Sequence, residues 1–226
     1  MSKIKLLQLK DLEPLIRADP NQKIYTLDRY YKPIQKIPYL KRFKMVLKLM
    51  NNKIYNNFLD IGFGSGIFLP ELASRSEKLT AIDKHDHVEI VKKIIESKNI
   101  SANLLKADIL NLPFPDNTFD GILCLSVLEF IKDIPKAVKE IKRVAKPNAK
   151  IIIGAPVLNS LTDFCYSIIK YKQYANLLHK SNHKTIIKHI KNNLQIKKIK
   201  TYLGFLPINL SLFFVLEATK EQKSFN

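Results

Sequence analysis

The sequence predicts an α/β fold, in which a parallel sheet carries helices on both faces, and three observations support it. Short apolar runs alternate with helical patterns through residues 56–157. Three of these runs end in an aspartate. The first run is followed at once by a turn that holds three of the chain's six glycines. Strands that alternate with helices at this spacing are typical of parallel sheets, which bind ligands at the carboxyl ends of their strands.

The first two strand and helix pairs lie between residues 56 and 98. The apolar run 56–62 predicts a buried strand, and a helix is expected at 66–75, where Pro70 is tolerable because it falls in the first turn. A second strand is expected at 78–83. The stretch 86–98 repeats apolar residues at helical spacing and predicts the helix that follows.

The remaining core elements lie between residues 102 and 157. A third strand at 102–108 leads into a loop rich in proline, aspartate and asparagine. A fourth strand is expected at 121–127. The helix at 133–148 is expected to stop at Pro147, and a fifth strand at 149–157 completes the core.

Acids and glycines mark the predicted carboxyl edge of this sheet. Asp60, Asp83 and Asp108 each end a strand, and Gly62, Gly64 and Gly66 follow the first of them. The spacing differs from the G-x-G-x-x-G nucleotide fingerprint, which would need a glycine at position 67. It still allows a tight turn and close approach of backbone to an anionic group. An acid 17 residues after the last glycine suits hydrogen bonds from ribose hydroxyls.

Through these motifs the chain resembles the class I S-adenosylmethionine-dependent methyltransferases, and in particular their small-molecule branch. The resemblance covers about residues 40–157, through "LDIGFGSG", "AID", "KADILNLPFPDNTFDGILCLSVLEFIKD" and "IKRVAKPNAKIIIGAPV". It implies a Rossmann-like, doubly wound and mostly parallel seven-stranded sheet with a reversed last strand, in three α/β/α layers. The final hairpin would come from residues 194–203 and 210–218.

The resemblance also implies a methyltransferase activity and an S-adenosylmethionine site. Asp60 and the turn Gly62–Gly66 would hold the methionine end of the cofactor, and Asp83 the ribose. Asp108 with Ile109 would contact the adenine, and Leu125 with Ser126 would line the methyl-transfer side. The full predicted set is Asp60, Gly62, Phe63, Gly64, Gly66, Asp83, Lys84, Asp108, Ile109, Leu125 and Ser126.

Two residues depart from the family pattern. Phe63 stands where relatives usually have a small residue or cysteine, and its side chain can point away from the cofactor. Phe130 stands where many relatives have histidine, which leaves Glu129 as the only ionisable residue there. Any reaction that needs that histidine is therefore in doubt.

Each candidate residue also has a purely structural interpretation. The three aspartates could be capping or turn residues, and Cys124 is interpreted as a small buried hydrophobe. His85 and His87 resemble a ligand cluster, but no metal site is expected. No catalytic residue is assigned. The candidate general bases, each also a common surface or packing residue, are Tyr25, Tyr30, Tyr31, His179 and His183.

The net charge of +18 is concentrated in the two flanks. Residues 1–57 carry 13 basic and 4 acidic side chains, and residues 160–226 carry 11 and 3, whereas the middle is nearly neutral. The flanks are also apolar and aromatic, with Phe164, Ile168, Tyr171 and Leu178 near one helical stripe. A core-packing helix explains that stripe, and a solvated surface explains the charge.

A more specific hypothesis is a lid for a small, anionic or amphipathic acceptor such as a lipid or glycan intermediate, with peripheral contact to an anionic membrane. The alternative is an RNA-binding or RNA-modifying protein, possibly non-catalytic, on the same scaffold. The fourth strand does not end in the Asn/Asp-Pro-Pro-aromatic motif of amino-methylating nucleic-acid enzymes. Nucleic acid is therefore the less favoured partner.

The chain is expected to form a single domain over residues 1–226. Its predicted parts are a basic lead-in at 1–57, a cofactor-binding core at 58–157, a helical substrate-side insertion at 158–193 and a hairpin at 194–219. Apolar runs are too short to span a bilayer, and the two cysteines form no disulfide framework. A cytoplasmic protein without a signal peptide is expected.

Overall fold

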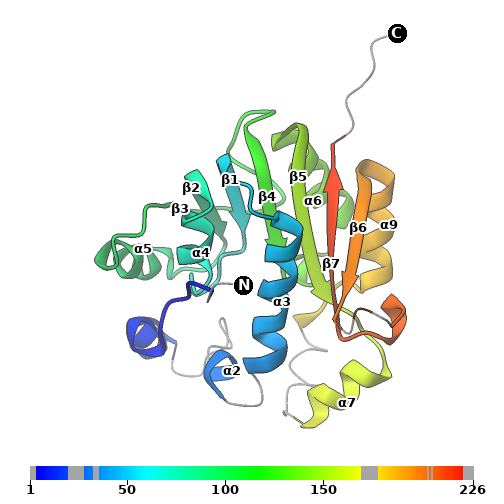
Figure 1. The fold of residues 1–226 in the computed structure, drawn as a ribbon, viewed down its shortest axis with the longest axis horizontal. Helices are drawn as coiled ribbons and strands as arrows, with labels where there is room; N and C mark the ends of the chain where they lie inside the picture. Colours follow the sequence, from blue (N-terminus) through cyan, green and yellow to red (C-terminus); the bar gives the residue numbers. More distant parts are fainter. Residues whose placement is uncertain are drawn as a thin grey trace.

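The computed structural model describes residues 4–19, 28–32, 36–168, 178–202, 204 and 206–220, without the side chains of 28 and 29. These residues form a seven-stranded sheet with the strand order β3-β2-β1-β4-β5-β7-β6, drawn in Figure 1. The first five strands pair in parallel, while β7 runs antiparallel to both β5 and β6. The predicted doubly wound fold with a reversed last strand is confirmed.

The strands correspond closely to the predicted segments, with ends that differ by a few residues. Their bounds are β1 Tyr55–Ile61, β2 Ser76–Asp83, β3 Asn103–Lys106, β4 Phe119–Leu125, β5 Ala145–Pro156, β6 Gln195–Thr201 and β7 Phe213–Thr219. Successive residues of each strand point to opposite faces of the sheet. Phe58 accordingly belongs to one hydrophobic cluster and Leu59 to the other.

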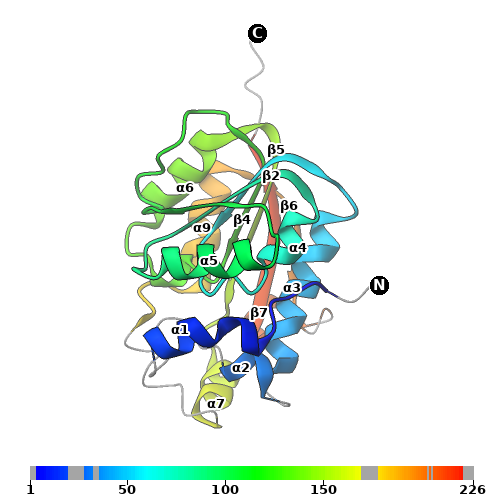
Figure 2. The same ribbon diagram turned by 90° about the vertical axis from the view of Figure 1, so that its left-hand side faces the viewer.

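Helices cover both faces of the sheet, as the three-layer prediction requires (Figures 1 and 2). The face that buries Phe58 is covered by α3 Lys36–Met50, α4 Leu69–Ala73 and α5 Val88–Ser97. The other face is covered by α6 Ile134–Val144 and α9 His183–Asn193, which also contact each other.

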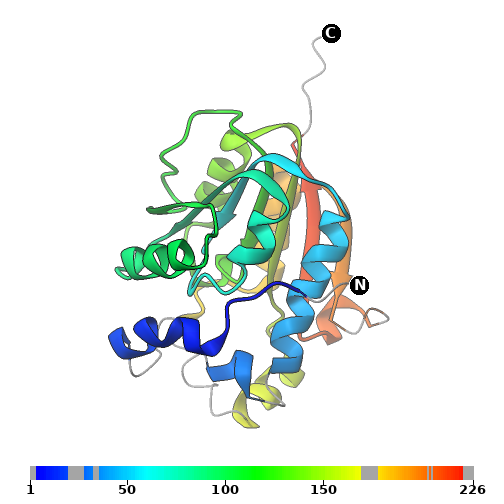
Figure 3. The same ribbon diagram turned by 60° about the vertical axis from the view of Figure 1, so that its left-hand side comes forward.

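Short helices from both flanks lie at the carboxyl edge of the parallel strands. They are η1 Leu9–Leu12, α1 Glu13–Ala18, α2 Asp28–Tyr31 and α7 Ser160–Ile168. In Figures 2 and 3 the last three lie below the sheet, at the end where the parallel strands finish. Two further turns of 3-10 helix, η2 Leu128–Phe130 and η3 Ile208–Leu210, follow β4 and precede β7.

Three predictions about helices need correction. The helix expected at 66–75 is the five-residue α4, which begins only at Leu69 because the glycine turn extends to Gly66. The helix expected to stop at Pro147 ends at Val144, since Ala145 already has extended backbone and begins β5. Within the predicted helical insertion 158–193, α7 lies at the carboxyl edge of the parallel strands, but α9 packs against α6 and β6 and covers the sheet.

Among the described residues, no helix has the length and apolarity needed to cross a bilayer.

Candidate functional site

The glycine turn after β1 has a backbone that residues with side chains rarely adopt. Gly62, Gly64 and Gly66 have φ angles of +82°, +57° and +73°. A Cβ built on Gly62 would lie 2.2 Å from Cγ2 of Val127, whereas one built on Gly64 would meet nothing within 4 Å. Glycine is therefore needed at 62 for packing as well as for φ. At Gly64 the backbone is open to the approach of another group.

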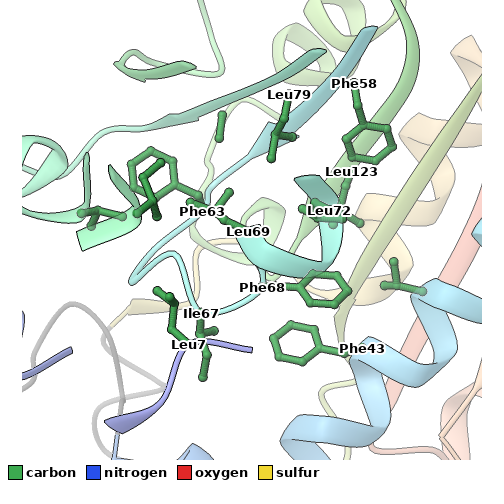
Figure 4. Packing of buried hydrophobic residues seen from close by; sticks show 14 of the residues in the cluster. Leu7, Phe43, Phe58, Phe63, Ile67, Phe68, Leu69, Leu72, Leu79 and Leu123 are labelled. Atoms are coloured by element: carbon green, nitrogen blue, oxygen red, sulfur yellow. The ribbon is translucent and has the colours of Figure 1, made fainter. Parts of the chain in front are cut away.

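Side chains on both sides hold this turn in place (Figure 4). The rings of Phe68 and Phe43 stack with their centroids 4.2 Å apart. The backbone N–H of Leu7 donates to the carbonyl of Ile67 at 3.2 Å, so the N-terminal segment also contacts the turn. The turn is thus buttressed by α3 and by the lead-in.

Asp83, at the end of β2, is bound directly to the glycine turn. Its Oδ2 accepts the N–H of Gly64 at 2.7 Å, and its Oδ1 accepts the N–H of Lys84 at 2.7 Å. The ring of His85 returns to the turn, with Nε2 2.9 Å from the carbonyl oxygen of Gly64. The fold thus brings the second-strand acid into direct contact with the glycine turn, while the predicted role of Asp83 toward ribose hydroxyls stays a prediction.

Asp108, at the end of β3, completes the row of strand-end acids. Its Oδ2 lies 2.6 Å from Nζ of Lys84, and its Oδ1 accepts the N–H of Leu110 at 2.9 Å. Burial tends to raise the pKa of Asp108, but the hydrogen bonds from Lys84 and Leu110 outweigh it and lower the pKa below its usual value. The neighbouring Ile109 is buried in the core.

Asp60 is buried and differs electrostatically from the other two acids. Burial, together with the charge of Asp83, raises its pKa to about 8. Within the described part of the chain, no hydrogen bond to its carboxyl group is found. A buried carboxyl group without a donor is stabilised in its charged form by a nearby cation, so this position suits a positively charged ligand group.

A partly buried arginine, which the sequence analysis did not single out, lies beside the end of β4. Arg42 of α3 donates through Nη1 to Oγ of Ser126 at 2.9 Å and through Nη2 to the hydroxyl of Tyr30. Its guanidinium lies 4.7 Å from the ring centroid of Tyr39. Ser126 itself has a φ of +59°, which is uncommon for a residue with a side chain. Arg42 thus ties the N-terminal helices to the predicted methyl-transfer side.

Glu129, near Arg42, is a buried ionisable residue. Burial raises its pKa to about 8, although the charge of Arg42 acts in the opposite direction. Among the described residues, neither Oε2 of Glu129 nor Nε of Arg42, both buried atoms, has a hydrogen-bond partner. Only the aromatic residues around position 42 in the sequence could have indicated a partly buried arginine, because its partners lie 12 and 84 residues away.

The remaining candidate residues pack against other side chains of the fold. Phe63 is buried, with its ring edge-on to that of His85, and Cys124 is buried within β4. Leu125 is partly buried against the core. Burial lowers the pKa of His179, whose ring contacts Phe130.

The candidate bases do not gather at one point. The hydroxyl of Tyr31 donates to the carbonyl of Leu7, and Nε2 of the buried His183 lies 3.1 Å from Oδ1 of Asn209. Tyr25 and Tyr171 lie outside the described residues. The described part of the chain holds no cluster of three or more metal-ligating side chains.

Known methyltransferases are similar to this chain in sequence and in fold. The family model described as a methyltransferase domain matches residues 59–153. A 2-phytyl-1,4-naphtoquinone methyltransferase of Nostoc is 33% identical over 116 residues, which cover 49% of this chain and 51% of that protein. A sterol 4-C-methyltransferase of Caenorhabditis elegans is 35% identical over 98 residues, which cover 42% and 29%. The chain thus spans about half or less of the length of these relatives.

Solved structures share the fold over nearly the whole chain. The N-methyltransferase NodS of Bradyrhizobium japonicum, solved in complex with S-adenosyl-L-homocysteine, superposes with a TM-score of 0.66. The superposition covers 94% of this chain and 99% of NodS, at 19% sequence identity. At this identity the likeness establishes the fold.

Proposed function

We propose that this chain, which carries a class I S-adenosylmethionine-dependent methyltransferase domain, transfers the methyl group of S-adenosylmethionine to a small-molecule acceptor. The observation that carries the proposal is the junction of the glycine turn with Asp83, where the N–H of Gly64 and the carboxylate are 2.7 Å apart. In Rossmann-like folds a glycine-rich turn after the first strand and an acid at the end of the second strand bind a nucleotide cofactor, and here the space beside the Cα of Gly64 is open.

The residues present fit this cofactor. Gly64 offers open backbone, and the Asp60 carboxyl group lacks a hydrogen-bond donor in the described part of the chain. We assign the methionine end to Asp60 and to the turn Gly62–Gly66, with Phe63 supporting the turn from within the core. Asp83 with Lys84 would hold the ribose, and Asp108 with Ile109 the adenine. Leu125 and Ser126 would line the methyl-transfer side.

The chain's own contribution to the reaction is binding and orientation. Bound S-adenosylmethionine supplies a methyl group on a positively charged sulfur, which is reactive without further activation. Arg42 fixes Ser126 at the end of β4, and α2 and α7 lie at the edge where an acceptor would enter. Holding the acceptor in line with the methyl group can supply much of the acceleration. No general base is assigned.

For the acceptor we propose a small apolar or amphipathic molecule. We propose further that the protein contacts an anionic membrane when it binds this acceptor. The named relatives act on a sterol and on a phytyl-naphthoquinone, which are both apolar. Phe164 and Ile168 of α7 are 64% and 66% exposed, so the core-packing interpretation of that stripe does not hold for them. Exposed apolar side chains at the acceptor edge suit an apolar acceptor.

Transfer of a labelled methyl group tests the proposal. Purified protein and S-adenosylmethionine labelled in the methyl group would be incubated with sterols, prenylated quinols, polyprenyl phosphates and, as a separate class, RNA. We expect labelled product in one of the lipid classes and a loss of at least about tenfold with Asp83→Ala. Label in RNA alone would support the alternative function, and no transfer in the presence of demonstrated cofactor binding would place the acceptor outside these classes.

A further inference from the structure

Large apolar side chains are exposed along one stripe of α7. Leu161, Phe164 and Ile168 are 41%, 64% and 66% exposed. They are three and four residues apart, so they lie on the same side of the helix. Apolar residues scattered singly over a surface are common, but a stripe of three along one short helix is the arrangement of an interaction site.

Two further elements extend this apolar surface at the same end of the molecule. Ile37 at the start of α3 is 59% exposed, and Leu210 of η3 is 56% exposed. Side-chain Nδ2 of Asn159, just before α7, donates to the carbonyl of Asn209 at 2.9 Å, so η3 lies beside the start of α7. The docking face is defined as Ile37, Leu161, Phe164, Ile168 and Leu210.

Lysines from both basic flanks lie in α3 and β6, and these two elements come together near the end of β6. Lys36 directly precedes Ile37, and Nζ of Lys41 lies 4.3 Å from the ring centroid of Tyr202, just after β6. The α3 helix of one flank therefore meets the end of β6 from the other. Lys198 and Lys200 are in β6, where Lys198 is paired opposite Glu217 of β7, and residues 178–202 themselves contain no aspartate or glutamate. Charge that is separated in the sequence is thus brought together in the fold.

We propose that the docking face binds the surface of an anionic lipid bilayer, with the α7 stripe entering the headgroup region and the lysines contacting the lipid headgroups. Apolar side chains with flanking lysines are the combination by which proteins lie on membranes. The apolar stripe is mostly aliphatic and favours lipid over nucleic acid, because nucleic acid is bound by basic grooves and by aromatic stacking. Bilayer binding would present the acceptor edge to the membrane.

Bilayer binding rests on the proposed function, because it would place the enzyme where an apolar acceptor is found, but it can be tested without methyl transfer. The full chain would be floated with vesicles of phosphatidylcholine alone and with vesicles that contain about 30% phosphatidylglycerol, at low and high salt. We expect binding to the anionic vesicles that weakens as salt screens the lysines. Far-ultraviolet circular dichroism confirms that every variant is folded.

Paired variants separate the apolar and the electrostatic contributions. Phe164→Ser with Ile168→Ser should weaken binding by at least about tenfold, because both side chains lose their place in the headgroup region. Lys198→Gln with Lys200→Gln should weaken it by roughly fivefold per lysine. The matched control is Ile54→Ser with Lys78→Gln. Ile54 is 55% exposed just before β1, and Lys78 is exposed near the start of β2, both away from the carboxyl edge.

Three outcomes would overturn the proposal: equal binding to neutral and anionic vesicles, equal loss in the control variant, or retention on an RNA oligomer without any binding to vesicles. Cofactor titration of the same samples separates this result from the proposed function. Protein that binds S-adenosylmethionine but floats with no vesicle would refute only the docking, and the reverse result would refute only the cofactor site.

Discussion

Gly62→Ala should be the most damaging of the glycine substitutions in the turn, and its cost can be worked from the structure. The new methyl group would lie 2.2 Å from Cγ2 of Val127, so Val127 or the turn must move. Forcing a side chain into a packed site costs about 1–3 kcal/mol. The φ of +82° adds about 1–2 kcal/mol of left-handed strain. We expect a loss of about 2–5 kcal/mol in the free energy of unfolding.

Gly64→Ala is the matched control for the strain. Its φ is +57°, but its Cβ would meet nothing within 4 Å, so only the strain of about 1–2 kcal/mol remains. Val127→Ala in the Gly62→Ala background should remove the collision, and the double variant should lose about 1–3 kcal/mol less than the sum of the single losses. Urea unfolding followed by circular dichroism would measure the wild type, the three single variants and the double variant. Equal losses at the two glycines, or simple additivity with Val127→Ala, would refute the packing argument.

Three further predictions concern the charged groups. The pKa of Glu129 is about 8 in the fold, so the folded protein holds a proton that the unfolded chain releases above about pH 4.3; stability should therefore fall as pH rises toward 8. Glu129→Gln should flatten that slope in urea unfolding between about pH 5 and 8, and an unchanged slope would contradict the assignment. Asp60, whose pKa is about 8, must ionise to pair with a cation, so affinity for S-adenosylmethionine should rise as the pH approaches 8. Calorimetry at several pH values should show this rise in the wild type and no such rise in Asp60→Asn. Lys84→Gln should change stability by less than about 1 kcal/mol, because Lys84 is largely exposed in its pair with Asp108; a larger shift in thermal unfolding would show that the pair is structural.

The sheet and the site's backbone could be predicted from local sequence. The core strands β1 to β5 contain apolar runs that end near turn signals, whereas β6 is mostly polar and exposed. The glycine turn and Asp83 are close enough in sequence for their meeting to follow from strand order. Helix ends were less predictable, because the extended backbone at Ala145 is set by pairing with the neighbouring strand rather than by Pro147.

Arg42 shows why the rest of the site could not be predicted. It lies in a helix with several other basic residues, and nothing local separates it from the exposed Lys44 or Lys48. Its burial follows from contacts with Tyr30 and Ser126, which only the tertiary fold brings near. Lys41 of α3 meets Tyr202, just after β6, for the same reason, so the sequence indicated two basic flanks but not that they contact each other.

Calorimetric titration with S-adenosylmethionine and S-adenosyl-L-homocysteine tests the central claim most directly. The wild-type protein should bind both, and Asp83→Ala and Gly64→Val should each weaken binding by at least about tenfold while the protein stays folded. Absence of binding to the folded wild-type protein would contradict the assignment of the glycine turn and Asp83 to the cofactor. So would affinities in the two variants that equal the affinity of the wild type.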